Sequence, residues 1–476
     1  MDRDLTAEVE AWISDDPDPV TASRLQKLLD SGDEETLRSF FSGFLQFGTA
    51  GLRGPNGPGP SCMNRAVVGR TAAGIAAYMK ARGMTRVVIG RDARYGSAEY
   101  AIESAEIFSG AGMEVFLLPR ALPTPVLAYA TTALKADVGV MVTASHNPPQ
   151  DNGYKVYIGP DADGIAYASS QIINPTDGFI ADEIKKIASL KSQPRGNTWT
   201  VLDETLVNEY VQRTTALGKK PGKLKIVYTA MHGVGTQTLS QVFTMAGFPD
   251  LILVSEQADP DPDFPTVAFP NPEEPGAIDL ALATARAHNA DLVIANDPDA
   301  DRCAAAIKDR SGNWRMLRGD ELGVIFGEWI ARTSPQGIFG NSIVSSSILR
   351  KISAHYGIEF REVLTGFKWL AKIEDLAFGY EEAIGYAVDS KTVNDKDGIS
   401  AAIYLAQIAT DLAAVGKDLN DLLDEVWLRH GFHATEQISI RVADMGAITA
   451  LLAGLRSNPP QEIAIFPEAV QNPTDQ

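Results

Sequence analysis

The chain has 476 residues, of which 45% are hydrophobic, and its 42 Lys and Arg against 61 Asp and Glu give a formal net charge of −19. This length predicts about three or four domains, and the composition is that of a folded globular protein, which excludes a single small module and wholesale disorder. The negative charge excludes a sequence-wide attraction to nucleic acid or to an anionic membrane, so a phosphate-bearing ligand requires a local cationic pocket.

The two cysteines, Cys62 and Cys303, stand far apart, without a CxxC pair or a histidine at metal-ligand spacing. This pattern argues against a disulfide framework and a zinc knuckle, and it fits a reducing compartment. The N-terminal segment carries early acidic residues and lacks the apolar core of a signal peptide, and no stretch reaches the ~18 apolar residues of a membrane span. We therefore expect a cytoplasmic protein without a membrane anchor.

The first residues predict two helices, because Leu5, Val9, Trp12 and Ile13 recur at helical spacing and a second periodic stretch covers 21–31. From Arg86 onward, short β-rich runs alternate with helical stretches, a pattern that indicates α/β units with largely parallel sheets. The expected strands are 87–89, 138–142, 224–228, 251–254, 292–295 and 343–344.

Three polar or Pro-rich stretches are candidate linkers: 191–198, 258–275 and 333–340. The stretch 258–275 fits a domain joint and a fixed loop inside one domain equally well. We expect boundaries near residues 205, 320 and 430, hence domains at 1–205, 206–320, 321–430 and 431–476. Strands recur that run into polar loops, which predicts repeated α/β domains with ligand loops at their strand ends; these loops are GRD (90–92), TASHN (143–147), TAMHG (229–233) and ANDPD (295–299).

The most informative segment is VGVMVTASHNPPQDNGYK at 138–155, in which an apolar strand delivers Ser145 and His146 to its end. A serine hydroxyl is a poor nucleophile unless a base or a cation lies beside it, and His146 and Lys155 are both near in sequence. Ser145 is therefore a candidate nucleophile. The alternative is that Ser145 only caps the turn that Asn147 opens.

A second segment, DLVIANDPDADR at 291–302, runs from a strand directly into Asp297, Asp299 and Asp301. Three carboxylates at alternate positions in a tight loop can converge on one hard cation, most plausibly Mg²⁺. An EF-hand is excluded, because its sixth position is Arg302 instead of Gly. The alternative is a solvated acidic turn, which mutual repulsion disfavours without a cation.

A third segment, GYEEAIGY at 379–386, offers Glu381 and Glu382, which could accept hydrogen bonds from vicinal sugar hydroxyls but are also typical of a solvated surface. Further cations stand in GTAGLRG and GRDAR (Arg53, Arg91 and Arg94), in TGFKW at 365–369 (Lys368) and in NDKDG at 394–398 (Lys396). Each of them is, taken alone, as compatible with a surface charge as with a phosphate ligand.

Together these segments resemble the α-D-phosphohexomutase superfamily, the phosphoglucomutase and phosphomannomutase enzymes, in the family's order from about Phe47 to Gly398. TASHNP followed by DPDADR is the specific part of the match. The resemblance implies an α/β protein with three consecutive domains that have mixed, largely parallel sheets around a central cleft, plus a fourth α+β domain. GTAGLRG, TGFKW and EEAIGY look most like the branch of phosphoglucomutase-like and phosphopentomutase-like members.

The resemblance also implies roles. Ser145 would be the phosphoserine and, with Asp297, Asp299 and Asp301, a ligand of Mg²⁺. The first domain would supply the phosphoserine, the second the metal site and the third sugar recognition. The residues that would bind the substrate are Arg302, Thr365, Gly366, Lys368, Glu381, Glu382 and Lys396, while Arg53 would draw charge off the moving phosphoryl group and His146 or Lys155 would shuttle a proton.

Two departures from the family pattern affect these expectations. Ala383 stands where the family's GEES loop has serine, which removes one hydroxyl from the sugar site. No RPSGTEPK-like phosphate loop follows Arg441, so we expect a truncated fourth domain at 431–476 and weak clamping of the distal phosphate, unless Lys368 or Lys396 serves instead.

The resulting expectation is a mutase that interconverts hexose 1-phosphate and hexose 6-phosphate, with glucose preferred, through phosphoserine and glucose 1,6-bisphosphate. Phosphomannomutase or phosphopentomutase activity is the alternative. One rival is a phosphatase with an aspartyl nucleophile, which would leave TASHNP unused. Another is a catalytically weak sugar-phosphate-binding protein. Sugar phosphates are the expected partners, with no nucleic acid or membrane, and the oligomeric state is left open between monomer and dimer.

Overall fold

The computed structural model describes residues 2–46, 51–159, 169–219, 222–436 and 445–459. The chain divides into two compact units, Met1–His433 and Ala434–Gln476. The second unit contributes one described helix, α16 (Met445–Ser457). The partial fourth domain expected at 431–476 falls largely on residues outside the described ranges.

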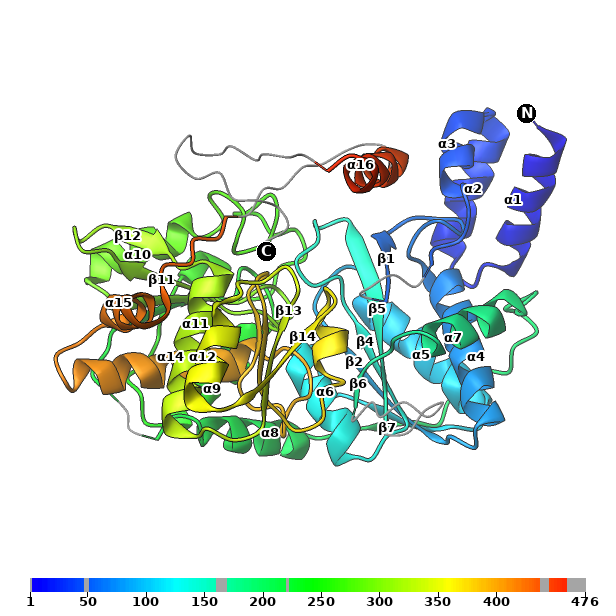
Figure 1. Cartoon of the computed structure of the whole chain (residues 1–476). Coiled ribbons are helices and arrows are strands. Elements are labelled where there is room, and N and C mark those ends of the chain that lie inside the picture. Colours follow the sequence, from blue (N-terminus) through cyan, green and yellow to red (C-terminus); the bar gives the residue numbers. More distant parts are fainter. Residues whose placement is uncertain (1, 47–50, 160–168, 220–221, 437–444, 460–476) are drawn as a thin grey trace. The chain divides into compact units, whose positions relative to one another are not determined.

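The first unit begins with three helices, α1 (Arg3–Asp15), α2 (Pro19–Ser31) and α3 (Glu34–Phe40), which Figure 1 draws in dark blue. An aspartate side chain caps the N-terminus of each, as Asp2 does for α1 by accepting from the backbone N–H of Asp4. Leu5, Val9 and Trp12 are buried on one face of α1, which confirms the predicted amphipathic helix.

Sheet I joins seven strands in the order β1-β5-β4-β2-β3-β7, with β6 paired to β5. β2 pairs in parallel with β3 and β4, whereas β5 runs antiparallel to β4 and β1. The strands are β1 (Leu52–Pro55), β2 (Arg86–Arg91), β3 (Glu114–Leu117), β4 (Val138–Val142), β5 (Asp151–Ile158), β6 (Ser170–Gln171) and β7 (Thr200–Val201).

Sheets II and III repeat this plan, with parallel strands inside and an antiparallel strand following. Sheet II has the order β12-β11-β10-β8-β9 and sheet III the order β14-β13-β15-β16. The strands are β8 (Ile226–Thr229), β9 (Ile252–Leu253), β10 (Leu292–Ala295), β11 (Ala304–Lys308), β12 (Trp314–Met316), β13 (Ile338–Ser342), β14 (Glu359–Val363), β15 (Leu376–Glu381) and β16 (Gly385–Ala387).

Helices alternate with these strands, as the sequence pattern predicts. Those that follow α3 are α4 (Arg65–Ala81), α5 (Ser97–Gly110), α6 (Thr124–Ala133), α7 (Thr176–Lys185), α8 (Thr205–Thr215), α9 (Gly235–Met245), α10 (Asp279–His288), α11 (Gly319–Thr333), α12 (Ile348–Tyr356), α13 (Phe367–Leu370), α14 (Gly398–Ala413) and α15 (Leu419–His430), with a 3-10 turn at Ser255–Gln257. Figure 1 shows α11 and α12 side by side against sheet III.

The strands predicted at 138–142 and 292–295 are confirmed residue for residue. The strand predicted at 343–344 is wrong, because β13 ends at Ser342 and the chain turns there, with the backbone N–H of Ser345 donating to the carbonyl of Ser342 over 3.0 Å. Ile343 and Val344 are exposed instead. The linker predicted at 333–340 shrinks to four residues, since α11 ends at Thr333 and β13 begins at Ile338.

The core is divided in an unequal way. One apolar cluster packs α1–α5 and α7 against one face of sheet I. A larger cluster starts at α6 on the other face and continues without a break through sheets II and III to α15. The three α/β layers therefore share buried surface, which fixes the strand ends of one sheet relative to those of the next.

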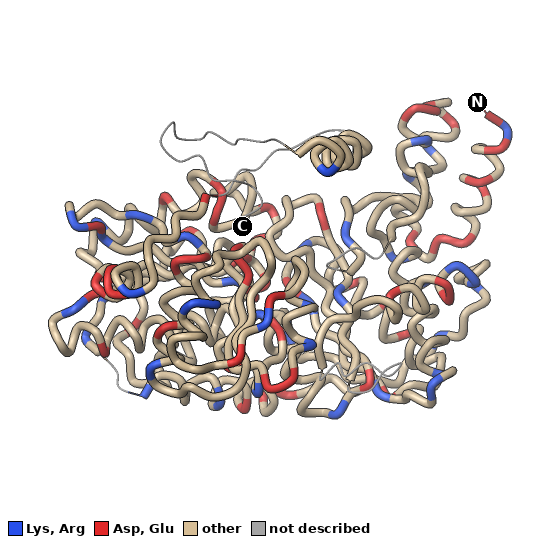
Figure 2. Tube along the Cα trace, viewed as in Figure 1, with Lys and Arg blue, Asp and Glu red and all other residues tan. Residues whose placement is uncertain are grey.

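No helix within the described ranges is long and apolar enough to cross a membrane. Acidic and basic residues are scattered over the described chain in Figure 2, and the basic ones do not gather in one patch of the trace. The cations that matter for a phosphate ligand are therefore individual buried side chains, and they are found at the strand ends described next.

Candidate active site

Ser145 stands in a strained turn directly after β4. Its φ is +51°, in the left-handed region that residues other than glycine rarely adopt, and its side chain is buried. The backbone N–H of Ser145 donates to Oγ1 of Thr143 over 2.9 Å, which stabilises the turn locally. Strain of this kind persists only where surrounding contacts hold it.

Arg94 supplies those contacts. Its guanidinium donates to the backbone carbonyls of Ser145 and Asn147, each over 2.6 Å, and to that of Pro148 over 2.8 Å. Asp92 lies 3.4 Å from the Nε of Arg94 and holds the side chain in place. The sequence named Arg94 as one cation among several; its role as a clamp on the serine loop requires the folded GRDAR turn beside it.

The three aspartates of the second loop come together as predicted. Asp297, Asp299 and Asp301 follow β10, all are buried, and their ligand oxygens lie within 4.8 Å of one another. The backbone N–H of Arg302 donates to Oδ1 of Asp297 over 3.0 Å and closes the loop.

The first α/β layer reaches this cluster with three side chains. The Ser145 hydroxyl donates to Oδ2 of Asp297 over 2.6 Å, and Thr124, at the start of α6, donates to Oδ2 of Asp299 over the same distance. Lys155 on β5 donates to Asp299 and Asp301, over 2.8 Å each. The nucleophile candidate and the carboxylates predicted from two separate motifs therefore form one site.

The cluster fits a divalent cation. Oδ1 of Asp299 and Oδ1 of Asp301 are buried and have no hydrogen-bond partner among the described residues. Burial and the charges of Asp299 and Asp301 raise the pKa of Asp297 well above its ordinary value. Burial would also raise the pKa of Asp299, but the adjacent Lys155 ammonium holds it below its usual range. Mg²⁺ prefers oxygen ligands such as carboxylates, so these two oxygens without hydrogen-bond partners could coordinate it.

His146 and Arg53 flank the serine. Nδ1 of His146 lies 3.3 Å from the Ser145 hydroxyl, and burial together with the charges of Arg302 and Arg53 lowers the pKa of the imidazole. Arg53 donates to the side-chain oxygen of Asn147 over 2.9 Å, while its Nε is buried without a partner among the described residues. The GTAGLRG motif that contains Arg53 includes residues 48–50, which lie outside the described ranges.

The turn between β15 and β16 lies against the loop that carries the three aspartates. Backbone bridging joins Arg302 to Gly385, and the N–H of Cys303 donates to the carbonyl of Ile384 over 3.0 Å. Lys396 stands beside both loops, with its Nζ 3.4 Å from Oδ2 of Asp301. Sheets II and III therefore present Arg302, Lys396 and Glu381 to one place.

The two adjacent glutamates differ in their environment. Burial raises the pKa of Glu381, and the charges of Lys396 and Arg302 act against that rise. Glu382 instead accepts from the hydroxyls of Ser342 and Ser345 over 2.8 and 3.0 Å, inside sheet III. The structure thus brings Glu381 to the predicted site and holds Glu382 in a hydrogen-bond network of its own sheet.

The TGFKW residues lie at the edge of this arrangement. Thr365 is exposed, and Gly366 has a φ of +112°, which only glycine adopts without strain. Lys368 is buried at 9% exposure and has no hydrogen-bond or ion-pair partner in the described part of the chain, and burial lowers the pKa of its amine. The contacts of these three residues do not include the aspartates.

Glu273 is a site residue that the sequence reading missed. It belongs to the Pro-rich stretch that was a candidate linker, whose Phe269 ring lies 6.2 Å from the His146 ring. Burial raises the pKa of Glu273 to about 7, with Arg302, Glu382 and Glu381 as its charged neighbours. A PNPEEPG run carries no local signal for this, because its position over the site depends on the fold.

The second sheet repeats the serine turn without the serine. Met231 in TAMHG has a φ of +50°, and its N–H donates to Oγ1 of Thr229 over 2.9 Å, as Ser145 does with Thr143. His232 follows and contacts Oγ1 of Thr266 over 2.8 Å. TASHN and TAMHG are therefore one structural device at the ends of two parallel strands.

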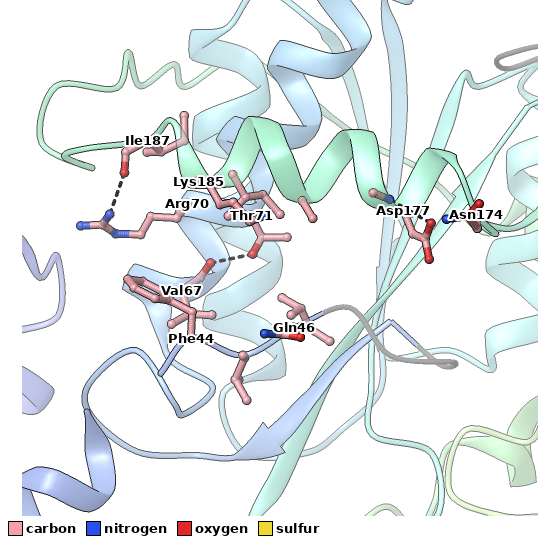
Figure 3. A pocket seen from close by; sticks show the side chains of 14 residues that line it. Phe44, Gln46, Val67, Arg70, Thr71, Asn174, Asp177, Lys185 and Ile187 are labelled. Atoms are coloured by element: carbon pink, nitrogen blue, oxygen red, sulfur yellow. Dashed lines mark hydrogen bonds between the residues drawn. The ribbon is translucent and has the colours of Figure 1, made fainter. Parts of the chain in front are cut away.

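A cavity of about 560 Å³ lies elsewhere, against α4 and α7 (Figure 3). Val67, Arg70 and Thr71 point into it from α4, opposite Asp177 and Lys185 of α7. Arg70 is already held by Asp15 over 2.7 Å and by the carbonyl of Ile187. None of the residues of the aspartate cluster lines this cavity, so it is separate from the site.

Comparison with known families and proteins gives three matches in a row. The sequence models for "Phosphoglucomutase/phosphomannomutase, alpha/beta/alpha domain" I, II and III match residues 45–177, 207–312 and 318–430. The Pro-rich stretch 258–275 falls within the second of these ranges, and the aspartates and glutamates fall within the second and third.

Individual proteins agree with this. The chain is 47% identical over 408 residues to a "Probable phosphomannomutase" of Haemophilus influenzae, covering 84% of this chain and 83% of that protein. It is 36% identical over 496 residues to a "Phosphopentomutase" of Mus musculus, covering 96% and 79%. The crystal structure of a "putative phosphomannomutase" of Thermus thermophilus aligns with a TM-score of 0.69 at 25% identity, covering 82% of this chain and 85% of that one.

Proposed function

Since the chain belongs to the phosphoglucomutase/phosphomannomutase family and is a phosphotransferase isomerase, we propose that it isomerises sugar monophosphates through a phosphoserine at Ser145. One observation carries the proposal: the Ser145 hydroxyl donates over 2.6 Å to Asp297, a member of a buried three-aspartate cluster contributed by another sheet. A hydroxyl that only capped a turn would have no reason to meet such a cluster.

The reaction has two transfers. Phosphorylated Ser145 gives its phosphoryl group to the free hydroxyl of a sugar monophosphate: the bond from Oγ to phosphorus breaks, a bond from the sugar oxygen to phosphorus forms, and the hydroxyl loses its proton. The bisphosphate then turns over and returns its other phosphate to Ser145, so that the isomeric monophosphate leaves. Arg53, near Asp299 and Asp301, and Arg302 are placed to stabilise charge on the transferring group.

Asp297, Asp299 and Asp301 would hold Mg²⁺, which when bound neutralises phosphate oxygens at the serine. The unpartnered oxygens of Asp299 and Asp301 support this assignment. In the structure Lys155 supplies the positive charge between these two carboxylates. That position ties up its ammonium protons, so Lys155 serves as an electrostatic partner of the loop.

His146 is then the better candidate for the proton shuttle. Its Nδ1 lies 3.3 Å from the Ser145 hydroxyl, and none of the described carboxylates forms an ion pair with its ring. A neutral imidazole beside the reacting oxygen can accept the hydroxyl proton in one direction and return it in the other. The Phe269 ring contacts the imidazole at a centroid distance of 6.2 Å, and His146 is partly buried, which would favour a reaction away from bulk water.

For the substrate, we propose a hexose phosphate, with glucose 1-phosphate as the first to test and glucose 1,6-bisphosphate as activator. Glu381, Lys396 and Arg302 would bind sugar hydroxyls and phosphate, and Lys368, buried without a partner among the described residues, would hold the distal phosphate beside Thr365 and Gly366. Mannose and pentose phosphates are the second candidates, favoured by the names of the relatives from Haemophilus influenzae and Mus musculus.

The decisive experiment is a turnover panel with glucose, mannose, ribose and glucosamine monophosphates, Mg²⁺ and a trace of the bisphosphate, combined with phosphopeptide mapping. We expect isomerisation without release of inorganic phosphate, phosphate mapped to Ser145, and loss of turnover in Ser145→Ala with an unchanged melting temperature. Release of inorganic phosphate would indicate a phosphatase. Binding without either product would indicate a sugar-phosphate-binding protein, and phosphate on another residue would overturn the assignment of Ser145.

A further inference from the structure

In the NDKDG loop between β16 and α14, each of four consecutive residues makes a different contact. Asp395 binds sheet I, and Lys396 lies beside Asp301 in the loop of the three aspartates. Asp397 caps α14 and binds Tyr210 of α8, and the backbone N–H of Gly398 donates to the carbonyl of Ala300 over 3.2 Å. A loop held at so many points has little freedom to place its one cation elsewhere.

Asp395 uses both carboxylate oxygens in this arrangement. Its Oδ1 accepts from the backbone N–H of Lys396 over 2.8 Å. Its Oδ2 accepts from the hydroxyl of Tyr157 and from the side-chain amide of Gln171, each over 2.7 Å. The carboxylate is 1% exposed. It therefore links the backbone of Lys396 directly to two strands of sheet I, β5 and β6.

The strand β5 completes the link. Tyr157 stands two residues after Lys155, so the two side chains leave the same face of the strand. Lys155 donates to Oδ2 of Asp301 over 2.8 Å, and Lys396 approaches that same oxygen to 3.4 Å from sheet III. The contact between Tyr157 and Asp395 consequently fixes the separation of two ammonium groups that share one carboxylate.

Lys396 itself is confined on its other sides. Its Nζ lies 5.6 Å from the centre of the Phe367 ring, and its side chain passes so close to Gly385 that a Cβ there would clash with its Cδ. The charge of Glu381 acts on it as well. Small movements of the loop backbone therefore translate into a displaced ammonium group.

We propose that Asp395 is a positioning residue that holds Lys396 in the substrate site by anchoring its loop to Tyr157 and Gln171 of sheet I. The inference rests on the proposed function, in which Lys396 binds the substrate. It adds that the affinity of Lys396 for sugar phosphate depends on the hydrogen bond between Tyr157 of sheet I and Asp395 of the loop.

Tyr157→Phe tests this, because it removes only the hydroxyl that donates to Asp395. The chain offers a matched control in Tyr210→Phe: Tyr210 is equally buried, and its hydroxyl donates over 2.9 Å to Asp397, two residues further along the same loop. Asp397 faces the N-terminus of α14, where it accepts from the N–H groups of Ile399 and Ser400. A purely structural role for Asp395 predicts equal behaviour of the two variants.

We expect both variants to lose similar stability in denaturant unfolding. Only Tyr157→Phe should raise the dissociation constant of glucose 6-phosphate, measured by calorimetry, and KM in the turnover assay, roughly tenfold, the effect of one hydrogen bond to a charged group. Its kcat should change by less than about threefold, because a displaced binding group affects the ground and transition states alike. Should Tyr157→Phe fail to fold, Gln171→Met removes the other donor to the same oxygen and is measured instead.

A double-mutant cycle identifies the route of the effect. In a Lys396→Met background, Tyr157→Phe should cause no further loss of affinity, whereas Tyr210→Phe should behave additively. Three results would each overturn the inference: equal losses of affinity in the two tyrosine variants, a loss in Tyr157→Phe that is confined to kcat, or additive losses of affinity from Tyr157→Phe and Lys396→Met. The proposed function fails separately, when the parent protein does not isomerise any sugar phosphate of the panel; the calorimetric comparison still decides the role of Asp395.

Discussion

At the scale of single residues, the site is defined by charges that are buried before any ligand arrives. Asp297, Asp299 and Asp301 are each at most 1% exposed, and Lys155, Lys396 and the Nε of Arg302 face Asp301 with compensating charge, at 2.8, 3.4 and 4.0 Å. Burying carboxylates without full compensation costs free energy. A cation that these carboxylates coordinate would offset that cost. Two predictions follow from these buried acids.

Removing one carboxylate should weaken metal binding and catalysis together. Asp299→Asn deletes a charge next to an unpartnered buried oxygen, so we expect the Mg²⁺ affinity, measured by calorimetry, and kcat/KM to fall by at least about tenfold each. Asp250→Asn, at an exposed position between α9 and β9 of the same α/β layer, is the control and should change neither. An Asp299→Asn protein that bound Mg²⁺ and turned over like the parent would show that the loop does not hold the metal.

Glu273 predicts a pH dependence of stability. Its carboxyl has a pKa of about 7 in the folded protein against 4.5 as the ordinary value, so the unfolded chain loses its proton first as the pH rises. The parent therefore loses stability between about pH 4.5 and pH 7, with no further change from this group above that window.

Glu273→Gln removes this loss. We expect the variant to match the parent at pH 4 and to exceed it by roughly 1–3 kcal/mol at pH 8 in the free energy of unfolding. Glu274→Gln, the same change on the neighbouring residue, is the control and should not reproduce that pH-dependent gain. A difference between Glu273→Gln and the parent that stayed constant from pH 4 to pH 8 would contradict the prediction.

At the scale of elements, the site depends on close packing between β16 and the NDKDG loop. A Cβ on Gly385 would meet the Lys396 side chain and lie 3.0 Å from Oε1 of Glu381. Because the confined side chains of Lys396 and Glu381 must shift to admit the methyl group, Gly385→Ala should lower kcat/KM at least about tenfold and the free energy of unfolding by about 1–3 kcal/mol. Gly178→Ala on α7, where a Cβ meets nothing within 4 Å, should leave both unchanged.

The same scale shows what the sequence could predict. The strands 138–142 and 292–295 are buried on both sides, so an uninterrupted apolar run followed by a polar loop was sufficient to locate them and the candidate residues at their ends. The pair Ile343–Val344 has the same local preference for a strand but lies in a turn, because the pairing of β13 with β14 and β15 ends at Ser342. Local composition does not contain that limit.

Contacts between loops were also beyond the sequence. The two motifs identified Lys155 and Glu382 as candidates. They did not show that Lys155 bridges Asp299 and Asp301 or that Glu382 accepts from Ser342 and Ser345. These partners are 37–146 residues away in the chain. Such contacts depend on how strands pair within a sheet and how one sheet packs on another, and the periodicity of the sequence does not record either.

At the scale of the whole molecule, the larger apolar cluster runs from α6 through sheets II and III. Leu127 on α6 is fully buried in it, whereas Ile180 on α7 is fully buried in the separate cluster on the other face of sheet I. Leu127→Ala should lower the free energy of unfolding by about 2–5 kcal/mol and speed hydrogen exchange in α14, far along the chain.

Ile180→Ala, a truncation of similar size, is the comparison. It should speed exchange in α4 and α7 while leaving α14 protected more nearly as in the parent, because its cavity opens on a cluster that ends within the first α/β layer. Equal acceleration of α14 in the two variants, measured by mass spectrometry, would show that the two clusters unfold as one.

The repeated turn of TASHN and TAMHG has a consequence in evolutionary terms. Ser145 and Met231 have nearly the same φ, +51° and +50°, and the same threonine cap, so the backbone device does not require a hydroxyl. Because the same turn carries serine at one strand end and methionine at the other, the turn and the side chain that it displays can vary independently. Met231 therefore shows what this turn looks like without a hydroxyl, within the same molecule as Ser145.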